Sequence, residues 1–176
     1  MGYELIKFFQ GFSSPLLDTI LIYFDYINSY YFYLIAIILL YIFWSKKFSL
    51  RLLLVCVITT IINLAFKYGL RLPPPSPNEI TIISDSGKSL SPYGFPSLSV
   101  QLAITFWFYL SLKAKKSWLT TLSIIIVIFI SISKLYLGAH FPFDLIGGAL
   151  LGGLVIWVYQ VLEKKIWRMN TNLPFP

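Results

Sequence analysis

The sequence contains one histidine, His140, and the residue types around it are suited to phosphoryl transfer. An imidazole has an ordinary pKa of about 6.5, so it is largely neutral and nucleophilic at physiological pH. Asp144, four residues later, can bind one ring nitrogen, which fixes the tautomer and makes the other nitrogen more nucleophilic. Lys134, six residues earlier, can supply positive charge to a phosphoryl group. Taken alone, a histidine at a membrane border can equally be one that only packs or faces water.

The composition places these residues in a membrane protein. The chain of 176 residues is 57% hydrophobic and 12% charged, and its mean hydropathy of +0.77 is outside the range of soluble globular domains. A membrane-spanning helix needs about 20 mostly apolar residues, so this length accommodates roughly five or six crossings and little else. We therefore expect a single membrane domain over residues 1–176, with the lipid bilayer as its surroundings.

The hydropathy pattern predicts an all-α helical bundle with five clear transmembrane helices. The apolar runs are Tyr30–Trp44, Phe48–Phe66, Val100–Leu112, Trp118–Ser133 and Phe143–Leu162. The preceding segment, Leu5–Ile27, mixes apolar and polar residues and is divided by Pro15, which indicates an interfacial helix followed by a short, partly inserted one. Paired glycines within the last run, at 147–148 and 152–153, are interpreted as sites of close helix packing.

The basic residues indicate how the chain is oriented. They give a net charge of +7 but form no stripe of the kind that binds nucleic acid. They gather instead near the ends of apolar runs, at Lys46, Lys47 and Arg51, at Lys113, Lys115 and Lys116, and at Lys164, Lys165 and Arg168. All three clusters are expected on one side of the membrane, which the positive-inside rule makes the cytoplasm.

The opposite, outer side is expected to carry the functional groups. It receives the segment Lys67–Pro96, which is rich in Pro, Ser and Gly and too long for a neutral connector, so we expect an extracytoplasmic active-site loop there. The segment around His140 lies on the same side. Pro142 and Asp144 suit the first turn of the last helix, so His140 is expected at the mouth of that helix.

Three segments resemble, in order and spacing, the signatures of the type 2 phosphatidic acid phosphatase (PAP2) family, which are Lys-x6-Arg-Pro, Pro-Ser-Gly-His and Ser-Arg-x5-His-x3-Asp. The third is the most complete, and its positions are filled by Ser133, Lys134, His140 and Asp144, with lysine in place of the family arginine. The matching residues of the first two are Lys67, Pro75, Pro96 and Ser97. Three other positions differ: Pro74 stands for the arginine, Leu98 for the glycine and Ser99 for the second-signature histidine.

The resemblance implies a six-helix membrane lipid phosphatase that needs no metal or cofactor. His140 would be the nucleophile that forms a phosphohistidine, and Asp144 its orienting partner. The candidate phosphate-binding residues are Lys67, Arg71, Ser97, Ser99 and Lys134. Arg71 either replaces the missing arginine or is a surface charge, and the sequence leaves both interpretations open. Lipid phosphates would enter from the bilayer, and water from the outer side.

The altered second signature bears on the substrate. A general acid contributes roughly 10²–10⁴-fold to a rate, and Ser99 cannot protonate a leaving group at neutral pH. Cleavage of a diphosphate expels a phosphate ester whose second pKa is about 6, whereas cleavage of a phosphate monoester expels a basic alkoxide. The sequence therefore favours a lipid diphosphate, such as a polyprenyl diphosphate.

Three classes of function are compatible with these observations. The first is a hydrolase or phosphotransferase acting on a lipid mono- or diphosphate at the outer face of a bacterial inner membrane. The second is a degenerate PAP2-like protein that binds a lipid phosphate or a partner without turnover, which the replacements at Pro74, Leu98 and Ser99 favour. A channel or transporter is the least favoured, because no predicted helix interior carries the charges of an ion path.

Overall fold

The computed structural model of the chain describes residues 2–83 and 91–170, and every regular element in this part is an α-helix. The helices are α1 (Gly2–Gln10), α2 (Pro15–Ile27), α3 (Tyr30–Phe43), α4 (Lys46–Leu70), α5 (Leu98–Ala114), α6 (Ser117–Tyr136) and α7 (Pro142–Asn170). The five predicted apolar runs correspond to α3 to α7, and the divided N-terminal segment corresponds to α1 and α2. The prediction of an all-α membrane bundle is confirmed.

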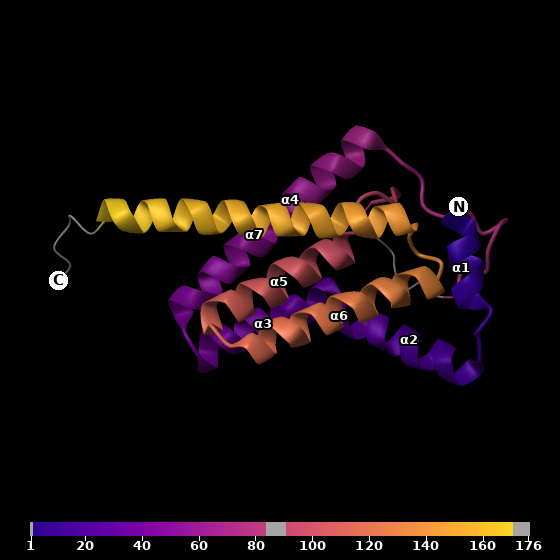
Figure 1. The fold of residues 1–176 in the computed structure, drawn as a ribbon, viewed down its shortest axis with the longest axis horizontal. Helices are drawn as coiled ribbons and strands as arrows, with labels where there is room; N and C mark the ends of the chain where they lie inside the picture. The colour runs from indigo at the N-terminus through magenta and orange to yellow at the C-terminus, as the bar shows by residue number, and fades with distance from the viewer. Residues whose placement is uncertain (1, 84–90, 171–176) are drawn as a thin grey trace.

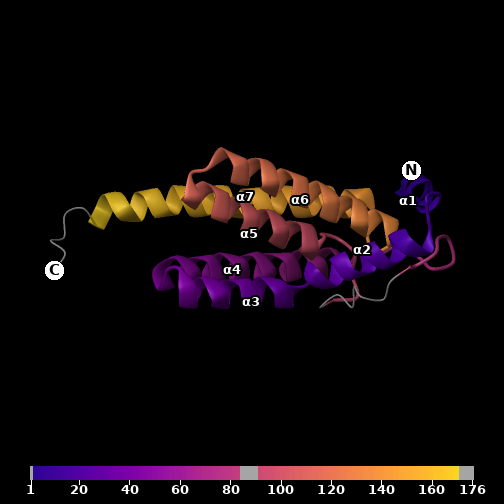
Figure 2. The same cartoon turned by 90° about the horizontal axis from the view of Figure 1, so that it is seen from below.

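The helices form a long bundle with α1 lying across one end (Figure 1). α7 follows the long axis with α5 and α6 beside it, while α3 packs against α4 on the other side of the bundle (Figure 2). α2 and α3 follow one another along this axis, with a break at Asn28 and Ser29 (Figure 2). The end of α4, the start of α5 and the connection between α6 and α7 lie toward the same end as α1 (Figure 1).

Helix length distinguishes the membrane spans from the shorter elements. In the part of the chain that the structure describes, α4, α6 and residues 142–163 of α7 are long and apolar enough to cross a bilayer. The bent pair of α1 and α2, at 119°, would make a fourth span if it is counted as one. α3 and α5 are shorter apolar helices, so the membrane must thin around them or their flanking residues must extend the crossing.

The basic clusters meet at the end of the bundle opposite α1. Glu163, near the C-terminal end of α7, forms an ion pair with Arg51 in the first turns of α4, at 3.0 Å. The same carboxylate pairs with Lys113 at the end of α5. The three clusters therefore share one end, and the segment around His140 lies at the other.

Gly148 and Gly152 allow α7 to approach α5 closely, which confirms the packing interpretation for these two, whereas a Cβ atom added to Gly153 would meet no atom within 4 Å. A Cβ atom added to Gly148 would lie 2.5 Å from the carbonyl oxygen of Ser97, and one added to Gly152 would lie 2.9 Å from the carbonyl oxygen of Gln101. Both contacts are with backbone atoms, which cannot move aside without separating the two helices. This packing sets the start of α5 against the start of α7.

Candidate active site

His140 and Asp144 lie together at the mouth of α7. The His140 Nδ1 atom is 3.5 Å from Asp144 Oδ2. The Asp144 carboxylate also accepts a hydrogen bond of 2.8 Å from the backbone N–H of Phe141, and the Asp144 N–H donates to the Phe141 carbonyl at 3.0 Å. These reciprocal bonds form a helix cap, with Pro142 as the first helical residue. The carboxylate is therefore fixed by the helix start while it faces the imidazole.

The surroundings of His140 favour the neutral imidazole. Its side chain is 12% exposed, and this burial lowers the pKa of His140 below its ordinary value. The positive charges of Lys134 and Lys67 lower the pKa further, while the Asp144 carboxylate opposes them. A neutral ring at physiological pH is the form that a nucleophile requires.

Lys67 lies in the last turn of α4, not in the loop as the sequence had suggested. α4 continues to Leu70, so the loop to α5 begins at Arg71. The Lys67 side chain is buried, and its Nζ donates hydrogen bonds to the carbonyl oxygens of Tyr93 and, at 3.1 Å, Gly94. The ammonium thus ties the segment before the second signature to α4 and contributes to the electrostatics of His140.

The second signature reaches the same place from the start of α5. Ser97 is fully buried, and its backbone N–H donates to the Asp144 carbonyl at 2.9 Å. A Cβ atom added to Gly94 would lie 3.0 Å from Pro74 Cα and 3.1 Å from Asp144 Oδ2. The second signature therefore contacts Asp144 through Ser97, and Pro74, in the position of the family arginine, lies against Gly94, which is itself close to the Asp144 carboxylate.

Lys134 enters the site from α6 and is held by a residue that sequence reasoning missed. Its ammonium forms an ion pair with the Asp25 carboxylate of α2, and the two side chains are 6% and 4% exposed. Asp25 belongs to the N-terminal segment that was interpreted only as partly inserted. A carboxylate within an apolar run was the available signal, because a charge at membrane depth usually has a partner and a role.

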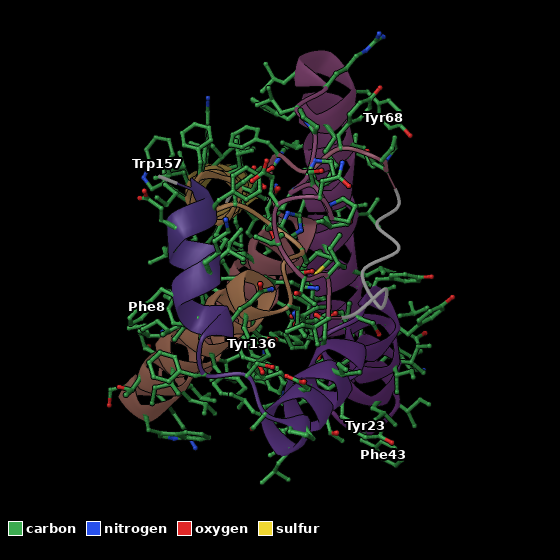
Figure 3. The ribbon with its side chains drawn as sticks, turned by 90° about the vertical axis from the view of Figure 1, so that its right-hand side faces the viewer. Phe8, Tyr23, Phe43, Tyr68, Tyr136 and Trp157 are labelled. Atoms are coloured by element: carbon green, nitrogen blue, oxygen red, sulfur yellow. The ribbon has the colours of Figure 1, made fainter. Side chains whose placement is uncertain are left out.

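The other two predicted phosphate ligands lie at helix ends, Arg71 after the last turn of α4 and Ser99 at the start of α5. Arg71 caps α4 in a left-handed conformation with φ 54°, is exposed, and donates from Nε to the Tyr68 carbonyl at 3.1 Å. Ser99 lies in the first turn of α5 and is partly exposed. Figure 3 shows the bundle from the end where α1 lies. Tyr68 of α4 is on one side of this view and α1 on the other, and Tyr136 of α6 lies between α1 and α2.

A buried polar cluster between α4 and α5 holds the second signature, and the sequence did not predict it. Asn63 Nδ2 donates to the Pro96 carbonyl at 3.1 Å and to Gln101 Oε1 at 2.8 Å. Gln101 Nε2 in turn donates to the Thr59 carbonyl at 3.2 Å. These hydrogen bonds between buried side chains join α4 to α5 and to the Pro96 carbonyl just before α5.

The site combines positive charge with free hydrogen-bonding atoms. Within residues 2–83 and 91–170, three buried polar atoms of signature residues lack a hydrogen-bond partner: His140 Nδ1, Ser97 Oγ and Ser133 Oγ. The same residues contain no group of three His, Cys, Asp or Glu side chains arranged to hold a metal ion. Buried hydroxyl groups and two buried ammonium groups on signature residues are of the kind that bind a phosphate anion.

Comparison with known proteins identifies this arrangement. The sequence profile of the PAP2 superfamily matches residues 48–168, which is more than half of the chain and includes all three signatures. The chain belongs to the PAP2 superfamily. The matched region begins in α4, so α1 to α3, including Asp25, lie outside it.

The chain is similar to bacterial proteins, two of which are described as lipid phosphatases. The chain is 26% identical to a lipid A 4'-phosphatase of Bacteroides thetaiotaomicron over 98% of its own length and 82% of that protein. It resembles the crystal structure of Aquifex aeolicus LpxE with a TM-score of 0.73, at 25% identity over 86% of this chain and 90% of that one. A phosphatidylglycerolphosphate phosphatase from Bacillus subtilis shares the fold, with a TM-score of 0.79 at 21% identity over 94% and 85% of the two chains.

Proposed function

We propose that this PAP2 protein cleaves a lipid mono- or diphosphate through a phosphohistidine on His140. The observation that carries the proposal is the His140–Asp144 pair, held at 3.5 Å by the cap of α7. Membership of a superfamily with lipid phosphatases among its members supports the substrate class. The buried ammonium groups of Lys67 and Lys134 support the binding of an anionic group beside the imidazole.

The geometry suggests a division of roles for the chemical steps. Nδ1 of His140 faces Asp144, so Nε2 is the atom that attacks phosphorus. A bond forms between Nε2 and phosphorus while the bond from phosphorus to the leaving oxygen breaks, and Asp144 stabilises the positive charge that develops on the ring. Water then attacks the phosphohistidine, which releases phosphate and restores the imidazole. Transfer to another lipid in place of water would give a phosphotransferase.

The missing second-signature histidine directs the proposal toward diphosphates. Ser99 supplies no acid at neutral pH, and a departing phosphate ester needs less protonation than a departing alkoxide. The names of the relatives concern lipid A and phosphatidylglycerolphosphate, which adds these two classes to the candidate substrates. A test should therefore compare a polyprenyl diphosphate with phosphorylated lipid A and phosphatidylglycerolphosphate.

The positive-inside rule predicts that the basic end of the bundle lies in the cytoplasm. The site lies at the opposite end, which supports a location on the outer side of a bacterial inner membrane. Single cysteines at Asn78, in the exposed loop after α4, and at Lys115, between α5 and α6, test this orientation. A membrane-impermeant thiol reagent should label the first and not the second in intact cells. Labelling of Lys115→Cys alone would place the active site in the cytoplasm.

A second candidate is a lipid-phosphate-binding protein without turnover. The specific observations that favour it are the replacements at Pro74 and Ser99 and the engagement of Lys67 with backbone carbonyls. Phosphate release from the three lipids by purified protein in detergent separates the two candidates. The enzyme releases phosphate from at least one of them, whereas a binding protein is protected by the lipid against heating and releases none.

A further inference from the structure

The buried pair of Asp25 and Lys134 joins a helix outside the matched PAP2 region to the third signature. Both side chains are almost completely buried, and Lys134 is close enough to His140 for its charge to act on the ring. A buried ammonium is unfavourable unless it is paired, so the carboxylate on α2 keeps this charge within the bundle. The pair therefore joins two helices and also holds a charge that acts on His140.

α2 holds the end of α6 at a second point. The Tyr136 hydroxyl donates to Asp18 Oδ1, and Asp18 also accepts a hydrogen bond of 3.1 Å from Ser13 Oγ. Asp18 and Asp25 are seven residues apart, which is about two helical turns, so they lie on the same face of α2. This face presents one carboxylate to the site lysine and one to the residue that ends α6. The last turn of α6 is therefore bound to α2 at two points.

A lysine in this position depends on such a tether more than an arginine does. The ammonium is a single charged centre on a flexible four-carbon chain, whereas the guanidinium of the family residue has five donors in a rigid fork. A single carboxylate can accept a hydrogen bond from one of the three N–H donors of the ammonium, which leaves the other donors for a phosphoryl oxygen. The side chain is then ordered before the substrate binds.

We propose that Asp25 is a positioning residue that holds the Lys134 ammonium in place for the phosphoryl group. The inference rests on the proposed function for the identity of that group. It adds α2 to the active site and predicts that Asp25 acts through Lys134 alone.

A double-mutant cycle on the full chain in detergent tests the proposal. The variants are Asp25→Asn, Lys134→Gln and the two combined, with Asp18→Asn as the matched control on the same face of α2. The probe is orthovanadate, an oxyanion of the same shape as phosphate, and its dissociation constant is measured by titration calorimetry. Because this binding needs no turnover, a wild-type protein that binds vanadate but releases no phosphate contradicts the proposed function and not the role of Asp25.

The expected result is a loss of affinity that depends on Lys134. Asp25→Asn should weaken vanadate binding about 10- to 100-fold, the range of a charge-assisted hydrogen bond, and should cause no further loss when Lys134→Gln is already present. Asp18→Asn should lower thermal stability and leave the affinity within about 3-fold of the wild type. Wild-type affinity in Asp25→Asn, or equal losses with and without Lys134, would overturn the proposal.

Should Asp25→Asn fail to fold, Asp25→Glu carries the test. It retains the charge and the ion pair but moves the carboxylate by one methylene group. A positioning role predicts a melting temperature close to that of the wild type with vanadate affinity at least about 3-fold weaker, an effect that Lys134→Gln removes. Unchanged affinity in this folded variant would contradict the proposal.

Discussion

The two ends of the bundle hold positive charge in different ways. At the basic end, Arg51 and Lys113 share Glu163, and their side chains are 32% and 31% exposed. At the other end, Lys67 and Lys134 are buried and are held by backbone carbonyls and by Asp25. Partly exposed pairs contribute little free energy because water and salt screen them, whereas a buried charge is unfavourable without a matched partner. The buried arrangement is therefore the one that a function must explain.

The largest expected effect is the loss of turnover when His140 is removed. His140→Ala should lower phosphate release at least about 1,000-fold, because the nucleophile is absent. The variant should remain folded and monodisperse, as judged by size-exclusion chromatography in detergent. Wild-type activity in this variant would exclude His140 as the nucleophile.

Substrate preference tests whether the protein can act without a general acid because its substrate has a good leaving group. Diphosphates should turn over at least ~10²-fold faster than matching monophosphates, the lower limit of what a general acid contributes. The double variant Leu98→Gly with Ser99→His restores the second signature and should raise the monophosphate rate more than the diphosphate rate. Equal acceleration of both substrates, measured as kcat/KM, would contradict the leaving-group argument.

A substitution in α7 can disrupt its close packing against α5 at the end of the bundle that contains the site. Gly148→Ala places a Cβ atom against the Ser97 carbonyl, so α5 and α7 must separate, and we expect a loss of about 1–3 kcal/mol in the free energy of unfolding together with lower turnover. Gly153→Ala is the control, because an added Cβ atom there meets no atom within 4 Å. Similar melting temperatures for the two variants would show that the approach of the two helices is not tight.

The pH dependence tests the charges around His140. Burial and the two lysines lower its pKa, and only the neutral ring attacks, so kcat/KM should rise with pH through that lowered pKa and reach a plateau below the ordinary value of about 6.5. Lys134→Gln removes a positive charge and should raise the His140 pKa, which moves the acid limb to higher pH. An unmoved limb would mean that Lys134 does not act on the imidazole.

The smallest effect is expected at the basic end. Glu163→Gln removes the carboxylate shared by Arg51 and Lys113, and it should change the free energy of unfolding by about 1 kcal/mol or less. Turnover should be unchanged, because Glu163 lies near the C-terminal end of α7, whereas His140 precedes the first turn of that helix at the other end of the bundle (Figure 1). A large loss of activity in a stable Glu163→Gln protein would contradict the view that only the buried charges at the other end serve the function.

Features with a local signal could be predicted from the sequence, and those that depend on distant pairing could not. The apolar runs predicted the positions of α3 to α7. The spacing of His140 and Asp144 predicted their approach, because Asp144 lies in the first turn of α7 and His140 closely precedes that helix. The pairing of Asp25 with Lys134 joins residues more than a hundred positions apart, so the carboxylate within an apolar run signals a partner but no local pattern identifies which residue it is. The placement of Arg71 depends on where α4 ends, and its side chain turns back on its own helix.

The central claim is a covalent phosphohistidine on His140, and trapping that intermediate tests it most directly. Purified protein is mixed with a lipid diphosphate, quenched in alkali, which preserves phosphohistidine, and digested for mass spectrometry. The account predicts phosphate on the peptide that contains His140 and none on the corresponding peptide of His140→Ala. A phosphorylated residue elsewhere in an active protein, or turnover that persists in His140→Ala, would contradict it.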